Sequence, residues 1–330
     1  PALRPEDAGV DHHLGNTAVV VLQPGTGEIL ALLGSADYWN DAINGRFNVA
    51  ADGLRQPGSA FKPFTYLTAF AQGYTPASML LDVRTVFETA SGPYVPENYD
   101  RRFHGPVRMR VALQRSYNIP AVQTLALVGV DNVIRTAHRL GINTLDASGD
   151  YGLALTLGGG EVTLLDMTYA FGVMADNGKM AGAPVPELLR RPGYRTLDPV
   201  MILRVEDASG KVLYEYQPQN QTILSPQLAY LMQNVLSDEQ ARWAAFGHPN
   251  PLELDRPAAA KTGTTNNFRD NWTLGFTPQL AVGVWVGNTD SSPMENVTGL
   301  TGAAPIWHAV MQYALRDIPP TGWTPPPGVT

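Results

Sequence analysis

Apolar residues recur at two different periods along the chain, and the change of period divides it into strands and helices. Two apolar runs, 17–23 and 28–34, flank the turn sequence Pro24-Gly25-Thr26-Gly27 and predict a hairpin. Further strands are predicted at 258–264, 271–276 and 280–287, and a second hairpin at 200–216. Apolar residues at helical spacing predict helices at 59–72, 107–116, 121–128, 131–140, 161–176, 225–236 and 304–315.

The order of these elements predicts the fold class. Strands joined by short turns favour antiparallel pairing, and the strands come from both chain ends with helices between them. We therefore expect an α+β fold, within the broader α/β class. It would have one antiparallel five-stranded sheet flanked by helices, and an all-helical insertion over roughly 73–199. We expect residues 17–317 to form this domain, with a linker remnant at 1–16 and a Pro-rich tail at 318–330.

The composition excludes several classes of protein. With 330 residues, 44% of them hydrophobic and 16% charged, the chain is typical of a folded globular protein. Its net charge is −7 and no basic run occurs, so we expect no nucleic-acid partner. The absence of cysteine excludes disulfides and thiolate metal sites. We expect neither a metal nor a cofactor, and no stretch approaches the roughly 20 apolar residues that span a bilayer.

Three short motifs place scarce residues in one order along the chain. They read S-x-x-K, S-x-N and K-T-G, and the last is followed by a threonine. Only one of the 11 serines stands three residues before a lysine, and two of the four lysines fall in the motifs. Singly, each motif has a commoner structural role, such as a serine N-cap or a solvated lysine. Together they describe one acyl-transfer site. Their residues are Ser59, Lys62, Ser116, Asn118, Lys261, Thr262, Gly263 and Thr264.

Helix geometry brings the first motif together. Pro63 is tolerated only in the first turn of a helix, so the helix must begin close to Ser59, with Lys62 one turn on and on the same face. A serine hydroxyl is a poor nucleophile without a base. A lysine can act as that base only if burial or a neighbouring cation lowers its pKa. Lys62 is therefore the candidate base, and Lys261 the candidate neighbouring cation.

The other two motifs supply groups that a peptide substrate needs. Ser116 can relay a proton to the leaving amine, and Asn118 can hydrogen-bond a peptide backbone. Gly263 leaves room for a substrate strand beside its own strand. Lys261 and the two threonines of its motif suit a terminal carboxylate. Backbone N–H groups at the helix start and on the K-T-G strand are candidates for an oxyanion hole.

Other candidate residues are weaker. His12-His13 resembles a metal-binding pair but lacks a third nearby ligand, and Gly158-Gly159-Gly160 is not followed by the G-K-[ST] of a phosphate loop. Glu161 could be taken for the deacylating carboxylate of a β-lactamase. As the expected first residue of a helix, it fits better as a favourable charge at the helix N-terminus.

Longer stretches around the motifs resemble the transpeptidase domain of class A penicillin-binding proteins, over about 16–315 of the chain. The supporting stretches are 56–64, 115–122, 161–167 and 261–265. The runs 268–278, 284–288 and 302–307 are similar to the 1C-type branch of that family.

The resemblance implies a penicillin-recognising fold, shared with β-lactamases, and a two-step acyl transfer on peptidoglycan stem peptides that end in D-Ala-D-Ala. It implies that Ser59 is acylated and that Lys62 accepts its proton. The second motif would then assist leaving-group protonation and substrate docking. The third would hold the carboxylate, with the backbone N–H of Thr264 in the oxyanion hole. β-Lactam antibiotics would acylate Ser59 and be released slowly.

The resemblance also bears on location and on alternatives. Class A members carry a membrane anchor and a glycosyltransferase domain ahead of this one, so we expect an extracytoplasmic domain anchored within a longer protein. A D,D-transpeptidase is the leading hypothesis. A D,D-carboxypeptidase, in which water replaces the acceptor amine, and a penicillin-binding sensor or scaffold without turnover stay open. A β-lactamase is disfavoured because no convincing deacylating carboxylate is found. The sequence does not rank acceptors, since that choice depends on cleft shape and water exclusion.

Overall fold

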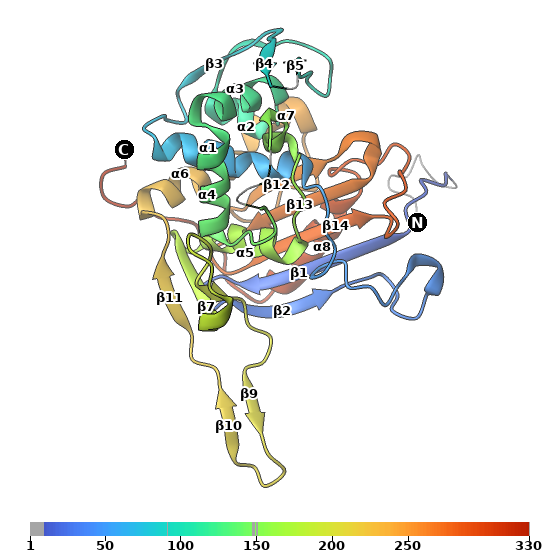
Figure 1. The fold of residues 1–330 in the computed structure, drawn as a ribbon, viewed down its shortest axis with the longest axis vertical. Helices are drawn as coiled ribbons and strands as arrows, with labels where there is room; N and C mark the ends of the chain where they lie inside the picture. Colours follow the sequence, from blue (N-terminus) through green and yellow to red (C-terminus); the bar gives the residue numbers. More distant parts are fainter. Residues whose placement is uncertain (1–9, 91, 147–148, 150, 330) are drawn as a thin grey trace.

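The computed structural model describes residues 10–90, 92–146, 149 and 151–329, and its centre is an antiparallel sheet built from both ends of the chain (Figure 1). The strand order is β12-β13-β14-β1-β2. The strands are β1 (Asn16–Gln23), β2 (Glu28–Leu33), β12 (Ala259–Thr264), β13 (Asp270–Phe276) and β14 (Ala281–Gly287). The prediction of a five-stranded antiparallel sheet is confirmed, and the N-terminal strand β1 lies between β14 and β2.

Two helices cover the two faces of this sheet. α5 (Leu164–Ala175) packs on one face and α8 (Ala303–Leu315) on the other. Side chains of β1 alternate between them, since Val20 belongs to the core on the α5 side and Val21 to the core on the α8 side. β13 and β14 are buried along their whole length. Burial on both faces explains why the sequence of β14 reads as a continuous apolar run interrupted only by glycine.

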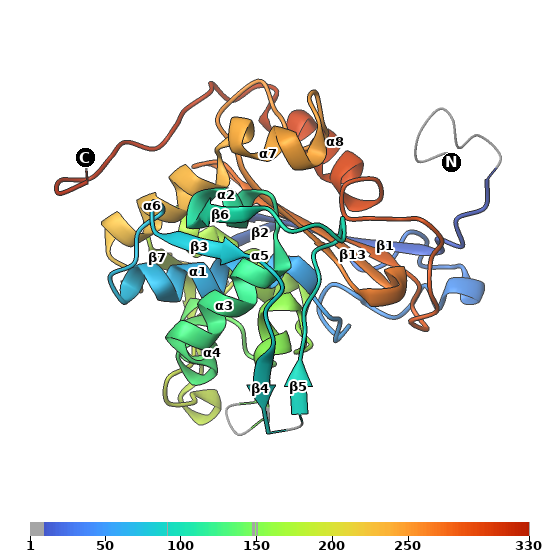
Figure 2. The same cartoon turned by 90° about the horizontal axis from the view of Figure 1, so that it is seen from above.

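The remaining helices gather beside the sheet, where Figure 2 shows α1 to α4 close together. They are α1 (Lys62–Ala71), α2 (Met109–Gln114), α3 (Asn118–Val128), α4 (Val130–Leu140), α6 (Pro226–Leu236) and α7 (Glu239–Phe246). Short 3-10 segments are η2 (Asp41–Ile43), η3 (Gly58–Phe61), η4 (Leu153–Leu157), η5 (Glu187–Leu189) and η6 (Asn266–Phe268). In the part of the chain that the structure describes, no helix has the length and apolarity needed to cross a bilayer.

The insertion over roughly 73–199 is not wholly helical, so the prediction of an all-helical insertion is wrong. Short strand pairs interrupt it: β3 (Met79–Asp82) with β6 (Gly105–Arg108), β4 (Phe87–Thr89) with β5 (Gly92–Tyr94), and β7 (Lys179–Pro184) with β8 (Leu197–Asp198). The stretch 76–105 is rich in Pro, Gly and Asn and lacks a helical period. Extended segments there satisfy their backbone hydrogen bonds by pairing with one another.

The starts of α3 and α5 each differ by three residues from their predicted positions. α5 begins at Leu164, because Thr163 caps it by accepting a hydrogen bond from the N–H of Asp166 at 3.1 Å. Glu161 therefore precedes the helix and is not its first residue. α3 begins at Asn118, since a proline in the first turn of a helix costs no hydrogen bond.

The predicted hairpin at 200–216 is confirmed and projects from the body of the molecule (Figure 1). It consists of β9 (Arg204–Glu206) and β10 (Val212–Glu215), and all residues from 201 to 215 are exposed. At its base, the N–H of Tyr216 donates to the carbonyl of Leu203 at 2.7 Å. The chain then returns through β11 (Gln219–Thr222), which pairs with β7.

The two ends of the chain were expected to be a linker and a tail. Of the linker expected at 1–16, residues 1–9 lie outside the described residues. Of the tail expected at 318–330, residue 330 lies outside the described residues. Within the rest, Trp323 contacts the body: its Nε1 donates to the carbonyl of Ala175 at 3.1 Å, and its ring meets that of Phe276 edge-on. The domain boundaries stay a prediction.

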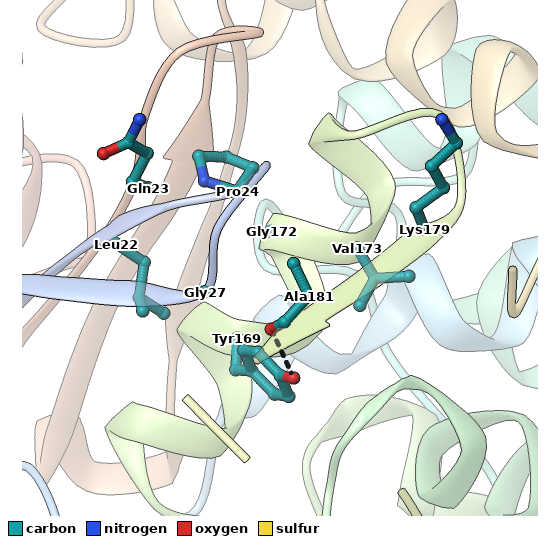
Figure 3. A pocket seen from close by; sticks show the side chains of 9 residues that line it. All are labelled: Leu22, Gln23, Pro24, Gly27, Tyr169, Gly172, Val173, Lys179 and Ala181. Atoms are coloured by element: carbon teal, nitrogen blue, oxygen red, sulfur yellow. Dashed lines mark hydrogen bonds between the residues drawn. The ribbon is translucent and has the colours of Figure 1, made fainter. Parts of the chain in front are cut away.

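A small cavity lies where the β1–β2 turn meets α5 and β7 (Figure 3). The hydroxyl of Tyr169 donates to the carbonyl of Ala181 at 2.8 Å and lies 3.1 Å from that of Leu197, which ties the strands β7 and β8 to the helix. The cavity volume is about 10 Å³, which is about the space that one water molecule needs. This cavity is therefore a packing defect and not a substrate site.

Candidate active site

The first motif lies where a short 3-10 turn runs into a helix. Ser59 belongs to η3, and Lys62 is both the residue that caps η3 and the first residue of α1. Pro63 sits in the first helical turn, so the predicted helix start close to Ser59 is confirmed. Ser59 is half-buried and Lys62 is fully buried.

The amine of Lys62 is held by the second motif. Its Nζ donates to the carbonyl oxygen of Ser116 at 2.6 Å and to Asn118 Oδ1 at 2.7 Å, and it lies 3.3 Å from Ser116 Oγ. Burial lowers the pKa of Lys62 well below its ordinary value, and the nearby charge of Lys261 lowers that pKa further. Both are causes that the sequence predicted for a lysine acting as a base. Among the described residues, no hydrogen bond joins Lys62 Nζ to Ser59 Oγ.

Ser116 lies between two lysines. Lys261 Nζ donates to Ser116 Oγ at 2.9 Å and to the carbonyl of Thr262 at 2.9 Å. The backbone of Ser116 is left-handed, with a φ of 58°, a conformation that is uncommon outside glycine and recurs at functional sites. Burial lowers the pKa of Lys261 to about 7, and the charge of Arg242 contributes in the same direction. The three motifs therefore meet at the side chain of Ser116.

The K-T-G strand approaches η3 so closely that side chains are excluded at two glycines. A Cβ on Gly263 would lie 2.1 Å from the carbonyl oxygen of Pro57. A Cβ on Gly58, whose φ is 55°, would lie 2.6 Å from the carbonyl oxygen of Thr264. Because these neighbours are backbone atoms, they cannot move aside cheaply. Gly263 thus lets the segment that carries Ser59 pack on β12, a role that the sequence did not indicate; its contact with substrate stays a prediction.

The two threonines of the third motif lie on the other side of the strand from Lys261. Thr264 Oγ1 accepts a hydrogen bond from the N–H of Gly299 at 2.9 Å, and Thr262 Cβ also lies close to Gly299. Lys261 points instead to Ser116, as expected for alternating residues in a strand. β12 is an edge strand of the sheet, so side chains on either face of β12 border the space beside that edge. A joint contact of these three residues with a carboxylate stays a prediction.

Arg242 is a buried cation that the sequence did not single out. It is 1% exposed, although its helix α7 is otherwise on the surface. Its Nε and Nη1 have no hydrogen-bond partner among the described residues. Burial lowers the pKa of Arg242 to about 10, and its charge helps to lower the pKa of Lys261. A single arginine in a short helix gives no sequence signal, because its burial is decided by tertiary packing.

Of the weaker candidates, Gly158 packs against the cluster, since a Cβ on it would lie 2.2 Å from the backbone N of Gly58, whereas Glu161 and His12 have other partners. Glu161 is exposed, and its carbonyl accepts a hydrogen bond from Thr144. His12 Nδ1 lies 2.8 Å from the carbonyl of Glu295. Within the described ranges, no group of three or more His, Asp or Glu side chains is placed to hold a metal ion.

The mixed fold, with a five-stranded antiparallel sheet and a serine–lysine pair at a helix start, is that of the penicillin-recognising serine enzymes. The model of the penicillin-binding protein transpeptidase domain matches residues 17–312, and the chain belongs to that family. The prediction of a class A penicillin-binding protein transpeptidase domain is thereby confirmed. The finer resemblance to the 1C-type branch stays a prediction.

Named relatives agree with this assignment. The chain is 32% identical to penicillin-binding protein 2D of Bacillus subtilis (strain 168), over 98% of this chain and 44% of that protein. It is 33% identical to penicillin-binding protein 1A of Aquifex aeolicus (strain VF5), over 94% of this chain and 39% of that protein. The chain thus spans less than half the length of these relatives.

Solved structures show the same fold. The crystal structure of penicillin-binding protein 1A from Haemophilus influenzae superimposes with a TM-score of 0.80 at 26% identity, over 94% of this chain and 49% of that one. PonA1 from Mycobacterium tuberculosis, solved in complex with penicillin V, gives a TM-score of 0.76 at 23% identity, over 94% of this chain and 80% of that one.

Proposed function

We propose that this domain is a serine D,D-transpeptidase that cross-links peptidoglycan and that β-lactam antibiotics acylate at Ser59. The observation that carries the proposal is the position of Ser116, whose backbone and side chain contact the amines of both Lys62 and Lys261. A buried lysine with a lowered pKa beside a half-buried serine suits nucleophilic catalysis. Membership of the transpeptidase family supports the same reaction class.

The first half of the proposed reaction forms an ester. Ser59 Oγ attacks the carbonyl carbon of the penultimate D-Ala of a stem peptide, and neutral Lys62 accepts the hydroxyl proton. Collapse of the tetrahedral intermediate breaks the peptide bond. The departing D-Ala amine takes a proton from Ser116 Oγ, which regains one from Lys62 across their 3.3 Å contact. Backbone N–H groups of the oxyanion hole are each typically worth about 3 kcal/mol to such an intermediate.

The second half transfers the acyl group. An amine from a second stem peptide attacks the ester carbonyl and loses its proton along the same route in reverse, so Ser59 regains its hydroxyl and a new peptide bond forms. A β-lactam would follow the first half only, because its ring-opened amine stays attached and blocks the acceptor. Lys261, with the two threonines of its motif, is proposed to hold the carboxylate that stem peptides and penicillins share.

We also propose that the domain works outside the cytoplasm, in a longer protein that a membrane anchor holds at the cell surface. Its stem-peptide substrates lie there, and its relatives are more than twice as long as this chain.

Labelling with a fluorescent penicillin tests the acylation step. We expect one label per wild-type chain and none on Ser59→Ala, since only Ser59 can form the ester. Ser35→Ala is a matched control, because Ser35 is buried and donates to the carbonyl of Gly45. Absence of labelling on the wild type, or equal labelling of Ser59→Ala, would refute the proposal.

Product analysis then separates the alternatives. With a D-Ala-D-Ala peptide and an added amine acceptor, a transpeptidase yields the joined peptide. Release of D-Ala with hydrolysed peptide alone would indicate a D,D-carboxypeptidase. Labelling by penicillin with no peptide turnover would indicate a sensor or scaffold.

A further inference from the structure

The helix that carries Asn118 is capped by a residue from outside the motif. α3 begins at Asn118, and the residue before it, Tyr117, makes no side-chain cap. Instead, Asn98 Oδ1 accepts the N–H of Asn118 at 2.8 Å and lies 3.4 Å from that of Ile119. Asn98 is 4% exposed and lies in the loop before β6. An N-cap of this kind is typically worth about 1 kcal/mol, and here it is supplied from 20 residues upstream.

A buried carboxylate sets the orientation of that cap. Asp82, at the end of β3, is fully buried, and Asn98 Nδ2 lies 2.9 and 2.8 Å from its two oxygens. Asn98 Nδ2 also lies 2.8 Å from the carbonyl of Arg102. An ionised carboxylate accepts hydrogen bonds and donates none, so the NH₂ of Asn98 must face Asp82. The amide oxygen of Asn98 is thereby forced toward the start of α3.

The same carboxylate also holds the ring that covers the middle residue of the S-x-N motif. His104 Nδ1 lies 2.6 Å from Asp82 Oδ2, and the backbone N–H of His104 donates to the same oxygen at 3.0 Å. The other ring nitrogen lies 3.1 Å from Asp100. The imidazole stacks on Tyr117, with ring centroids 4.0 Å apart. Asp82 thus supports Tyr117 through one partner and Asn118 through another.

The side chain of Asn118 is fixed at its amide end as well. Asn118 Nδ2 donates to the carbonyl of Glu97 at 2.7 Å, which leaves Asn118 Oδ1 to accept from Lys62 at 2.7 Å. Adjacent residues, Glu97 and Asn98, therefore hold the side chain and the backbone of Asn118. Its oxygen has one orientation available, toward Lys62.

This orientation matters because a neutral lysine has two N–H bonds and one lone pair. The two short contacts of Lys62 Nζ go to the carbonyl of Ser116 and to Asn118 Oδ1, and both of these oxygens only accept. These contacts use both hydrogens and leave the lone pair for a hydroxyl proton. If Asn118 Oδ1 moved, a hydrogen would be free to occupy the direction of the lone pair.

We propose that Asp82 and Asn98 are positioning residues for the catalytic base, and that they act through Asn118 on the lone pair of Lys62. This inference rests on the proposed acylation of Ser59. Neither residue touches the reacting atoms, so we expect them to affect the rate of acylation and not the binding of the β-lactam.

Exchanging the two side chains tests this role. In Asp82→Asn the amide of Asn98 loses its forced orientation, and in Asn98→Asp two carboxylates face each other. The double variant Asp82→Asn/Asn98→Asp restores the contact between the two side chains, because the amide introduced at position 82 can donate to the carboxylate introduced at position 98 while its oxygen accepts from His104. It does not restore the contact of Asn98 Nδ2 with the carbonyl of Arg102, since a carboxylate cannot donate to a carbonyl. We expect each single variant to lower the acylation rate constant at saturating penicillin about 10- to 100-fold, as for loss of a charge-assisted hydrogen bond. The double variant should recover part of this loss, to a rate at least about threefold above that of either single variant.

The controls separate positioning from folding. Active-site titration with labelled penicillin counts the folded molecules, and rates are expressed per folded molecule. Asp166→Asn removes a different buried carboxylate, on α5, that pairs with Arg195; it should lower the Tm while leaving the acylation rate unchanged. If Asp82→Asn does not fold, Asn98→Ala provides the same loss of the cap with Asp82 still bonded to His104.

The outcomes are distinct. Wild-type rates in the single variants, or a double variant that is acylated no faster than either single variant, would overturn the positioning role. A wild-type protein that penicillin does not label at Ser59 would instead refute the proposed function. A fall in apparent penicillin affinity with an unchanged rate constant would also contradict the inference, because it would assign these residues to binding.

Discussion

At the scale of single residues, the site contains two buried lysines whose pKa values are lowered. Lys62 is fully buried, and burial together with Lys261 lowers its pKa. Lys261 is 2% exposed, with a pKa lowered to about 7. Burying two amines of like charge is costly unless at least one is neutral. Burial is therefore the main cause of both lowered pKa values, with the charge of Lys261 adding to the effect at Lys62 and that of Arg242 at Lys261.

Lys62→Arg tests the base while keeping a positive charge at this position. A guanidinium stays protonated at every accessible pH, so it cannot accept the Ser59 proton. We expect the rate of penicillin acylation at pH 7 to fall by about 10²- to 10⁴-fold, the usual contribution of a general base. Lys211→Arg, on the exposed hairpin, is the matched control. A rate within threefold of the wild type would exclude Lys62 as the proton acceptor.

The residues of the three motifs could be chosen from the sequence because their spacing carries the chemistry. Asp82, Asn98 and Arg242 could not, because their roles depend on partners brought close only by the fold. Asp82 meets Asn98 across a 16-residue loop, and Asn98 meets Asn118 across 20 residues. Neither pair leaves a periodic or compositional trace.

At the scale of elements, the decisive contact is that of η3 with β12. It brings the segment that carries Ser59 against the K-T-G strand, and it depends on the glycines at 58 and 263. The indole N–H of Trp272, on β13, adds a hydrogen bond to the carbonyl of Gln56 at 2.8 Å. The geometry of the site is thus set by backbone packing as well as by catalytic side chains.

Gly263→Ala should separate these two elements. Its Cβ would lie 2.1 Å from the carbonyl oxygen of Pro57, so η3 or β12 must shift. We expect a loss of about 1–3 kcal/mol of unfolding free energy, as for overpacking, together with slower penicillin acylation of the folded molecules. Thermal or urea unfolding and labelling kinetics measure the two effects.

The control for this variant is Gly25→Ala, in the β1–β2 turn, where a Cβ would meet nothing within 4 Å. It should change neither stability nor rate by a measurable amount. If Gly263→Ala behaves in the same way, the close approach of η3 to β12 is not needed for the site.

Element type was easier to predict than element boundaries. The sheet strands have apolar runs and turn signals, and the structure has all five. The starts of α3 and α5 were misplaced because a cap or a first-turn proline, and not the apolar period, decides where a helix begins. The short strands inside the insertion were missed because most of them have four residues or fewer, which is too few to show a period.

At the scale of the whole molecule, the chain forms one body with a projecting hairpin (Figure 1). Residues 201–215 are all exposed, and they include apolar side chains such as Ile202 and Leu213. An isolated two-stranded hairpin is marginally stable in water. The hairpin therefore adds little to the stability of the body.

Replacing residues 204–215 with a short Gly-Asn-Gly turn should leave the domain intact. Leu203 and Tyr216 are already joined by a backbone hydrogen bond, so a tight turn can connect them. We expect the Tm to change by less than about 3 °C, because contacts between the hairpin and the body contribute well under about 1 kcal/mol to stability. We expect the rate of penicillin labelling to stay the same. A variant that unfolds or fails to label would show that the hairpin supports the body.

The insertion of β1 between β14 and β2 has a consequence for the order of events during synthesis. β1 pairs with a strand that lies more than 250 residues later, so contacts of this kind close a long loop and form slowly. The segment with the nucleophile leaves the ribosome long before residue 261. An activity that needs both Ser59 and Lys261 is therefore absent from a growing chain until residue 261 has been made and β12 has joined the sheet.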